Sequence, residues 1–305
     1  MQAATACVSS VKSRDDIMTI RRVIPVIVFV HCLICHLHGQ DFAAPDTISV
    51  RSGDMKLKAL LWRPHGSGPF PALIWSHGNY ASTSSPGTVD AMIGSVTLTY
   101  LLGQEFSRNG YVFLGLFRRG TGLSAGEGES SQDLLLRSLK EGSLEERNKL
   151  QVHLLETEQM QDIVSGLQFL RRSRYVDTGR LAVIGHSFGG SLALLLAERE
   201  PSLKAVVSFG AGAKSWNSSP PLRARLIECV THISAPVLLI CAKNDYSTNP
   251  ADSLGAVMDH LGKSHSVIIY PPFGNNADVG HNFIFLGVPI WERDVLGFLG
   301  KSLNH

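Results

Sequence analysis

Cysteine, an excess of one charge and long apolar runs are all scarce in this 305-residue chain, and each shortage excludes a class of protein. Three of the five cysteines precede residue 40, and the remaining two, Cys229 and Cys241, are too few for a disulfide framework. Lys and Arg number 28 against 26 Asp and Glu, which leaves no basic excess for binding nucleic acid. The most apolar run, residues 23–37, is short for a membrane-spanning helix of roughly 20 residues.

Residues 1–39 show the three-part pattern of a secretory signal peptide. Arg21 and Arg22 precede the apolar run at 23–37, and small and polar residues follow it. Met18 stands just before the basic pair, so the residues ahead of it are consistent with a start site placed too early. We therefore expect a secreted or periplasmic protein that makes no stable membrane insertion after signal cleavage. An uncleaved N-terminal segment that anchors the protein to a membrane is the alternative.

Removal of this leader, with cleavage expected near Gly39 or Ala44, changes the balance of charge and of cysteine. It leaves 24 basic and 24 acidic residues, so the domain at 40–305 carries no net charge. It also leaves no Cys-x-x-Cys metal pattern. Cys241 ends an apolar run and is expected to be a buried small side chain, while its pairing with Cys229 in an oxidising compartment stays open.

The domain that follows has the pattern of repeated strands and helices. Alternation of apolar and polar side chains around a Ser-Gly-Asp turn predicts an antiparallel hairpin over residues 46–64. Short runs that are apolar on both faces come next, as expected of parallel strands covered on both sides. These predicted strands lie at residues 71–78, 111–120, 180–187, 204–212, 235–245 and 265–274.

Helices are predicted between these strands from apolar residues at three- and four-residue steps. They lie at residues 99–110, 154–173, 189–200, 251–264 and 288–303. Two further segments follow the carboxyl ends of strands: residues 127–155, which are polar and expected to be helical, and residues 211–234. Because open α/β sheets bind ligands at that edge, both are candidate lids or walls of a substrate pocket.

Gly185, Ser187 and Gly189 match the pattern Gly-x-Ser-x-Gly at a predicted strand-to-helix junction. The pattern alone can arise by chance in a chain of this length, but its position is that of a nucleophile elbow. Small residues permit the tight turn that raises the serine hydroxyl above the N-terminus of the helix. The alternative is a Gly-rich turn that binds phosphate, for which the Gly-x-Gly-x-x-Gly and P-loop patterns are missing here.

A serine hydroxyl needs a base to take its proton and a third group to orient that base. Asp245 ends the strand predicted at 235–245 and is the candidate acid; Asp252 competes with it, and a helix or turn cap is its non-catalytic alternative. His281 is the candidate base, because it is the one histidine between the last predicted strand and the last predicted helix, on a Gly-rich loop. Asp278, three residues earlier, is a further group that could orient the ring.

Attack on a carbonyl develops negative charge on its oxygen, which needs two preorganised N–H donors. The backbone N–H of Phe188, which follows the serine and opens a helix, is the first candidate. His77 and Gly78 let the chain turn close to the substrate, so the second donor is expected from Asn79 or Tyr80. Asn79 is slightly preferred, and the phenol of Tyr80 is a further candidate.

Five stretches of the chain resemble the α/β-hydrolase family, in its dienelactone hydrolase-like and prolyl oligopeptidase-like branch. In chain order they are "SHGNY", "FRRGTGLSAGEG", "VDTGRLAVIGHSFGG", "APVLLICAKND" and "GHNF". The resemblance implies an α/β fold with a mostly parallel central sheet, an N-terminal antiparallel hairpin, helices on both faces and a helical insertion or lid. It implies a serine hydrolase with Ser187 as nucleophile, Asp245 as acid and His281 as base.

The resemblance also has departures. Dienelactone hydrolases proper carry a cysteine nucleophile where this chain has Ser187. Prolyl oligopeptidase-type enzymes usually bring a propeller domain, and no repeat of that period precedes this domain. Arg119 and Ser124 fall in the Arg-Gly-x-Gly-x-Ser loop of this branch, which implies that they stabilise loops beside the site.

The expected function is hydrolysis of carboxylic esters through an acyl-enzyme on Ser187, with no metal or cofactor. A peptidase of the prolyl oligopeptidase or acyl-aminoacyl type is the first alternative, so the expected partner is a small-molecule ester or a short peptide. A non-catalytic binding protein on a hydrolase scaffold is the second. The sequence does not indicate an oligomeric state.

Overall fold

The computed structural model describes residues 44–79 and 95–303. The leader predicted at 1–39 and the oxyanion candidate Tyr80 lie outside these residues. Within the described ranges, no helix is both long enough and apolar enough to cross a membrane.

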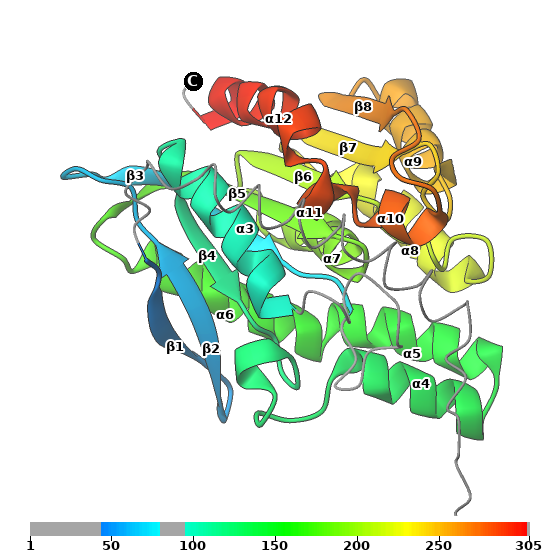
Figure 1. Ribbon diagram of the computed structural model, residues 1–305. Helices are drawn as coiled ribbons and strands as arrows, with labels where there is room; N and C mark the ends of the chain where they lie inside the picture. The colour runs from blue at the N-terminus through cyan, green and yellow to red at the C-terminus, as the bar shows by residue number, and fades with distance from the viewer. Residues whose placement is uncertain (1–43, 80–94, 304–305) are drawn as a thin grey trace, which may run out of the picture. The chain divides into compact units, whose positions relative to one another are not determined.

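Eight strands form one sheet across the described part of the chain (Figure 1). They are β1 (Asp46–Ser52), β2 (Met55–Trp62), β3 (Phe70–Ser76), β4 (Val112–Leu116), β5 (Val176–His186), β6 (Ala205–Phe209), β7 (Val237–Ala242) and β8 (His265–Tyr270). Their order is β1-β2-β4-β3-β5-β6-β7-β8. β1 and β2 form the predicted antiparallel hairpin, β2 is antiparallel to β4, and every other pair is parallel. The predicted α/β fold is confirmed.

Helices cover both faces of the sheet, as the two-sided apolar strands predicted (Figure 1). One face carries α3 (Ser95–Arg108), α11 (Phe283–Leu286) and α12 (Val288–Leu303); the other carries α5 (Leu144–Glu156), α6 (Glu158–Arg171), α7 (Phe188–Arg199), α8 (Pro220–His232) and α9 (Asn249–His260). Successive residues of β3 point to opposite cores, so Ile74 packs with α6 and α7 while Trp75 packs with α11 and α12. Burial of each such side chain contributes about 1.5–3 kcal/mol and holds the strand ends in place.

The helix predicted at 154–173 is wrong in its extent, because the chain breaks at Thr157 between α5 and α6. Thr157 leaves the helical region, with φ −114° and ψ −99°. Its hydroxyl donates to the His153 carbonyl at 2.7 Å, a local bond that competes with regular helix geometry. The sequence prediction joins the apolar residues up to Leu155 and from Met160 onward into one helix, across four polar residues that contain the break.

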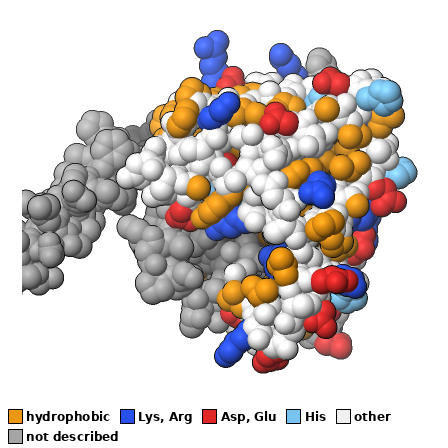
Figure 2. Space-filling model, turned by 90° about the vertical axis from the view of Figure 1, so that its right-hand side faces the viewer, with side chains coloured by type: hydrophobic (Ala, Val, Ile, Leu, Met, Phe, Trp, Pro, Cys, Tyr) orange, Lys and Arg blue, Asp and Glu red, His pale blue; other side chains and the backbone are white. Residues whose placement is uncertain are grey.

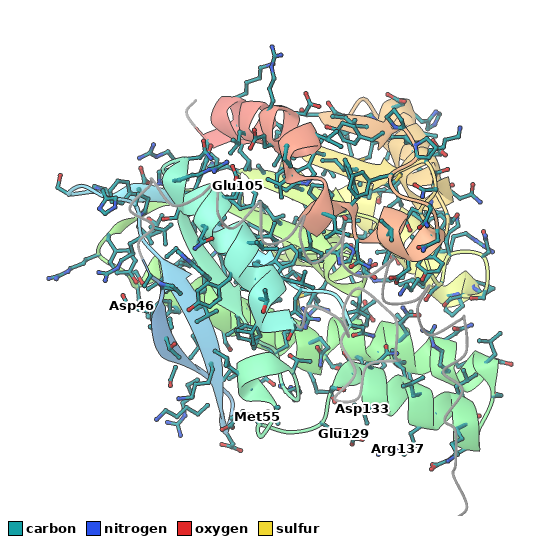
Figure 3. The ribbon with its side chains drawn as sticks, in the orientation of Figure 1. Asp46, Met55, Glu105, Glu129, Asp133 and Arg137 are labelled. Carbon is teal, nitrogen blue, oxygen red and sulfur yellow. The ribbon has the colours of Figure 1, made fainter. Side chains whose placement is uncertain are left out.

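The predicted insertion at 127–155 contains α4 (Ser131–Glu141) and nearly all of α5. Ser130 begins α4 by accepting a hydrogen bond from the Asp133 N–H, and Glu129 pairs with Arg137 on its exposed side (Figure 3). The segment predicted at 211–234 is a series of turns followed by α8. On the face shown in Figure 2, acidic and basic side chains are interspersed, in keeping with the balanced composition.

Candidate active site

Ser187 stands at the junction of β5 and α7, at the carboxyl edge of the parallel strands. Its φ of 57° makes it the one non-glycine residue with positive φ in the described part of the chain. Such a conformation costs roughly 1–3 kcal/mol and persists only where the surroundings enforce it. Here the Ser187 N–H donates to the Phe209 carbonyl at 2.8 Å, and the Ser187 carbonyl accepts from Ser191 N–H at 3.1 Å.

The glycines of the motif are required by space. A Cβ on Gly185 would lie 2.1 Å from the Gly189 carbonyl oxygen, and a Cβ on Gly189 would lie 2.0 Å from the Ser76 carbonyl oxygen. These neighbours are backbone atoms, which cannot move aside as a flexible side chain can. The sequence interpretation of a nucleophile elbow therefore agrees with the geometry of this turn.

The structure brings Ser187, His281 and Asp245 together from three separate strand ends. The Ser187 hydroxyl lies 2.8 Å from His281 Nε2, and His281 Nδ1 lies 2.7 Å from Asp245 Oδ1. Because a carboxylate only accepts, Nδ1 carries the proton and Nε2 is left to accept from the serine. The side chains of His281 and Asp245 are 2% and 1% exposed, so water does not compete for this bond.

His281 does not lie on a plain Gly-rich loop as predicted. It is the last residue of the short helix α10 (Ala277–His281), whose N-cap Asn276 accepts from the Val279 N–H at 2.9 Å. Gly274 and Gly280 favour a loop, and the polar residues Asn275, Asn276 and Asp278 between them do not distinguish a loop from one turn of helix. The His281 ring still contacts Ser187 and Asp245 from the end of this helix.

The competing carboxylates are elsewhere. Asp252 is exposed on the first turn of α9, where it accepts from the Thr248 hydroxyl at 3.2 Å. Asp278 Oδ1 lies 3.4 Å from the Tyr246 hydroxyl. The cap expected as the alternative role of Asp245 is not formed at α9, whose N-cap is Thr248; Asp245 Oδ1 instead accepts from the neighbouring Tyr246 N–H at 2.6 Å. That second bond fixes the carboxylate toward His281.

His186 is a site residue that sequence reasoning missed. Its Nε2 donates to the His281 carbonyl at 2.8 Å, and the two rings lie 4.8 Å apart between centroids. Burial, aided by the neighbouring His281, holds the pKa of His186 well below its usual range, so the ring is neutral. It occupies a variable position of the Gly-x-Ser-x-Gly pattern, which carries no signal for such a role.

The oxyanion candidates meet the nucleophile from two sides. Phe188 is the first residue of α7, so its N–H has no acceptor within the helix. A Cβ on Gly78 would lie 3.5 Å from Ser187 Cβ, which shows that the chain after β3 runs directly against the elbow. Asn79 follows it, and its side-chain oxygen accepts from the Ser131 hydroxyl at 2.5 Å.

Arg119 and Ser124 hold the loop that follows β4. Arg119 Nη2 lies 2.7 Å from Asp162 Oδ1 on α6. Ser124 accepts from the Lys58 N–H and donates to the Phe117 carbonyl, both at 2.8 Å. These contacts are structural, in keeping with the role that the family resemblance implies.

The two insertion segments contact each other beside the site. Asn148 of α5 donates to the Ser218 carbonyl at 2.6 Å, and the Arg147 guanidinium lies within 3.5 Å of the Ser215 hydroxyl. The Lys214 ammonium lies 4.7 Å from the ring centroid of Tyr246, a residue whose own ring is 5.2 Å from that of His281. The turns after β6 therefore reach the neighbourhood of the triad.

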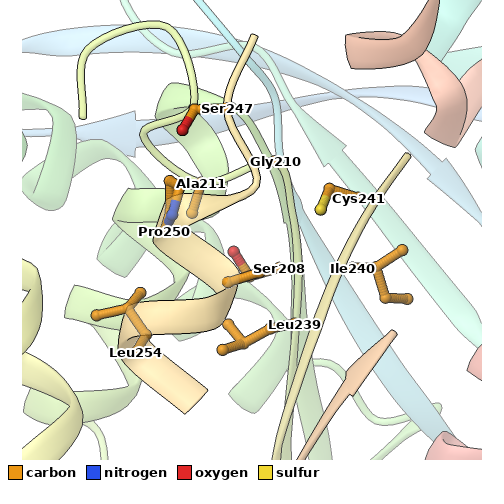
Figure 4. A pocket seen from close by; sticks show the side chains of 10 residues that line it. Ser208, Gly210, Ala211, Leu239, Ile240, Cys241, Ser247, Pro250 and Leu254 are labelled. Atoms are coloured by element: carbon orange, nitrogen blue, oxygen red, sulfur yellow. The ribbon is translucent and has the colours of Figure 1, made fainter. Parts of the chain in front are cut away.

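Two hollows in the described chain are lined by neither Ser187 nor His281. A cavity of about 10 Å³ lies behind the Asp245 loop, between Ser208, Cys241 and Pro250 (Figure 4), and holds about one water at most. A recess of about 570 Å³ opens beside Lys204 and Ser264, at the amino ends of the strands and thus opposite Ser187.

Cys229 and Cys241, the cysteines of the described ranges, are free, buried thiols, so no disulfide joins them. Burial raises the pKa of Cys241 to about 12 and that of Cys229 further. Such thiols are inert packing groups. Within the described ranges, no cluster of three His, Cys, Asp or Glu side chains could hold a metal ion.

Residues 99–285 match the dienelactone hydrolase family, and this segment contains Ser187, Asp245 and His281. The chain belongs to the dienelactone hydrolase family. A comparison with curated proteins found no match.

Solved structures similar to this family member share its fold at low identity. Pyrococcus horikoshii acylaminoacyl peptidase is 17% identical with a TM-score of 0.60, over 86% of this chain and 41% of that one. A dienelactone hydrolase from Anabaena variabilis is 19% identical with a TM-score of 0.54, over 86% and 100%. A puromycin-hydrolysing peptidase from Mycobacterium tuberculosis is 16% identical with a TM-score of 0.59, over 85% and 39%. The chain thus spans about two fifths of each peptidase.

Proposed function

We propose that the protein is a serine hydrolase that cleaves carboxylic esters through an acyl-enzyme on Ser187. The observation that carries the proposal is the unbroken hydrogen-bonded series from the Ser187 hydroxyl through His281 to Asp245, with distances of 2.8 and 2.7 Å. A buried acid, a base and a hydroxyl in this order form a working nucleophile, and the hydroxyl stands on a strained turn that exposes it. Membership of a hydrolase family supports the same conclusion.

In the first half of the reaction, Ser187 Oγ attacks the carbonyl carbon of the ester while His281 Nε2 takes the hydroxyl proton. The carbonyl π electrons move to the oxygen, and Asp245 stabilises the imidazolium that forms. Collapse of the tetrahedral intermediate breaks the bond to the alcohol oxygen, which leaves with the proton from His281. The product of this half is an ester of Ser187.

In the second half, His281 takes a proton from water, and the resulting hydroxide attacks the acyl carbon. The bond to Ser187 Oγ then breaks, Oγ recovers the proton, and the carboxylic acid is released. Negative charge on the carbonyl oxygen appears in both halves. The Phe188 N–H at the N-terminus of α7 is the first donor proposed for it, and the Asn79 N–H is the second.

Esters are preferred to peptides for two reasons. An alkoxide leaves with less help than an amine, so an ester is the substrate class that any triad of this geometry can process. A lactone is itself a cyclic ester, and the family takes its name from a lactone hydrolase. The peptidases share the fold at 16–17% identity, and this chain spans only 39–41% of them. Peptide hydrolysis is therefore the second candidate.

Purified protein tests the order of these candidates. We expect turnover of p-nitrophenyl acetate that Ser187→Ala abolishes, and slower turnover of aminoacyl anilides. Equal rates in the wild type and the variant would remove the assignment, and a clear preference for anilides would reverse the order. A fluorophosphonate that failed to label Ser187 would instead favour a non-catalytic binding protein.

Two further proposals concern the surroundings of the site. We infer that segments 127–155 and 211–234 form the walls of the acyl pocket, since they contact each other and Lys214 of the second approaches Tyr246 beside His281. A panel of p-nitrophenyl esters with increasing acyl length, compared between the wild type and Tyr246→Ala, tests this. The leader pattern at 1–39 supports secretion, which N-terminal sequencing of protein recovered outside the cytoplasm tests.

A further inference from the structure

We propose that Arg118 is a positioning residue that, with the ring of His77, orients the Gly78–Asn79 peptide so that the Asn79 N–H faces the oxyanion. The inference rests on the proposed function. Arg118 follows the carboxyl end of β4 and is 1% exposed, which places a cation in the interior beside the reaction centre. The sequence analysis did not single it out.

The Gly78 carbonyl is held by two donors. His77 Nδ1 lies 2.7 Å from it and Arg118 Nη2 lies 3.2 Å from it. The Arg118 backbone N–H donates to His77 Nε2 at 3.1 Å, so Nε2 is the acceptor of the ring and Nδ1 carries the proton. Burial, with the charge of Arg118 adding to it, holds the pKa of His77 well below its usual range and keeps this tautomer neutral.

The orientation of the carbonyl decides that of the next N–H. The Gly78–Asn79 peptide is trans and planar, so its C=O and its N–H point in opposite directions. With the carbonyl directed at Arg118 and His77, the N–H of Asn79 is directed away from them. A Cβ on Gly78 would contact Ser187 Cβ at 3.5 Å, so the nucleophile lies immediately beside this peptide.

Arg118 is itself fixed from several sides. Its Nε donates to Gln159 Oε1 at 2.8 Å, and its Nη1 lies 3.4 Å from the Ser76 hydroxyl. Its guanidinium lies 5.5 Å from the ring centroid of Phe188, the residue that supplies the first proposed donor. One side chain therefore contacts both Phe188 and the carbonyl of the Gly78–Asn79 peptide, whose N–H is the second proposed donor.

Neighbouring Arg119 supplies a matched control, because it contacts Asp162 rather than the oxyanion loop. The experiment compares the wild type with Arg118→Met, Arg118→Lys and Arg119→Met. Thermal unfolding gives the folded fraction of each. The rate constant for fluorophosphonate labelling of Ser187 reports on the oxyanion hole without a natural substrate, and p-nitrophenyl acetate gives kcat and KM.

Arg118→Met is expected to lower the labelling rate and kcat of the folded protein by about 10²-fold, the low end of the range for losing one oxyanion donor, with KM little changed. Arg118→Lys keeps the positive charge but not the planar guanidinium with its several N–H donors. Its labelling rate and kcat are expected to lie between those of Arg118→Met and the wild type. Arg119→Met is expected to lower the unfolding temperature while the folded protein keeps its rates.

Three results overturn the inference. The first is labelling of folded Arg118→Met at the wild-type rate, and the second is a loss of rate in Arg119→Met as large as that in Arg118→Met. The third, where Arg118→Met does not fold, is labelling of Arg118→Lys at the wild-type rate. Failure of the proposed function gives a different result, since the wild type itself would then not be labelled at Ser187.

Discussion

Two buried aspartates, Asp162 and Asp245, illustrate how a structural polar cluster differs from the cluster that we propose to be reactive. Asp162 on α6 accepts from the Ser52 hydroxyl at 2.7 Å and from Arg119 through its backbone N–H, Nε and Nη2 at 2.7–3.0 Å. Asp245 accepts from the Tyr246 N–H at 2.6 Å and from His281 at 2.7 Å. Distances and burial alone do not separate the two.

The hydrogen-bond partners of Asp162 and Asp245 distinguish the two clusters. Arg119 stays protonated at every working pH, so the Asp162 cluster has one charge state and no proton to transfer. The partner of Asp245 is an imidazole, which can take a proton and return it. That imidazole contacts a serine with a φ of 57°, at the edge of the sheet where ligands bind. A titratable partner, a strained neighbour and a position at the strand ends together mark the reactive cluster.

The largest expected effect is that of Ser187→Ala. We expect kcat/KM for p-nitrophenyl acetate to fall by about 10⁴-fold or more, because the variant removes the hydroxyl that lies 2.8 Å from His281 Nε2. The free energy of unfolding should change by less than about 1 kcal/mol, since alanine meets the same strained backbone. Steady-state kinetics with urea unfolding checks both. Substantial remaining esterase activity would place the nucleophile elsewhere.

The matched change at the acid is Asp245→Asn. The amide donates to His281 Nδ1 and leaves the proton on Nε2, where it can no longer accept from Ser187. We expect kcat to fall by about 10⁴-fold with the fold preserved. A pH–rate profile of the residual activity, measured beside the wild type, would show whether the tautomer is responsible. A loss smaller than about tenfold would show that Asp245 does not orient the base.

The same change at the structural cluster, Asp162→Asn, should have the reverse profile. It leaves Arg119 without its countercharge at a site where the carboxylate is 0% exposed, so we expect a loss of about 3–5 kcal/mol in the free energy of unfolding. The folded fraction should keep the wild-type kcat. Urea titration followed by circular dichroism measures the first, and kinetics corrected for folded protein measures the second. A fall in kcat of folded Asp162→Asn comparable to that of Asp245→Asn would end the distinction.

The contrast between these clusters also explains what could be predicted. That Ser187, Asp245 and His281 lie close together could be predicted from the sequence, because each follows a strand that is apolar on both faces, and parallel strands end at one edge. The fold was found from the same runs. The local apolar pattern, and the position of each residue at the end of a predicted strand, carried enough information for the fold and for these three residues.

The roles of neighbouring residues such as Arg118 and Arg119 could not be predicted, because they depend on contacts with residues far apart in the sequence. Arg118 and Arg119 are adjacent and chemically identical, yet one reaches Gln159 and the Gly78 carbonyl while the other reaches Asp162. No local pattern tells them apart, because side chains of α6 decide which arginine turns where. The helix break at Thr157 was missed for a local reason, because the four polar residues between Leu155 and Met160 were interpreted as part of one continuous helix.

The smallest expected effect concerns the neutral histidines behind the site. Burial lowers the pKa values of His77 and His186 in the folded protein, so below about pH 6.5 the unfolded chain binds protons that the folded protein does not. Stability is therefore expected to fall as the pH drops from 7 to 5. Each ring contributes at most about 1.4 kcal/mol per pH unit to that slope.

His186→Gln, whose amide can still donate to the His281 carbonyl, should flatten the slope by up to that amount in urea titrations. His260→Gln, at the exposed end of α9, is the control that should leave the slope unchanged. An equally steep slope in His186→Gln would show that this ring is protonated in the fold, which its burial opposes.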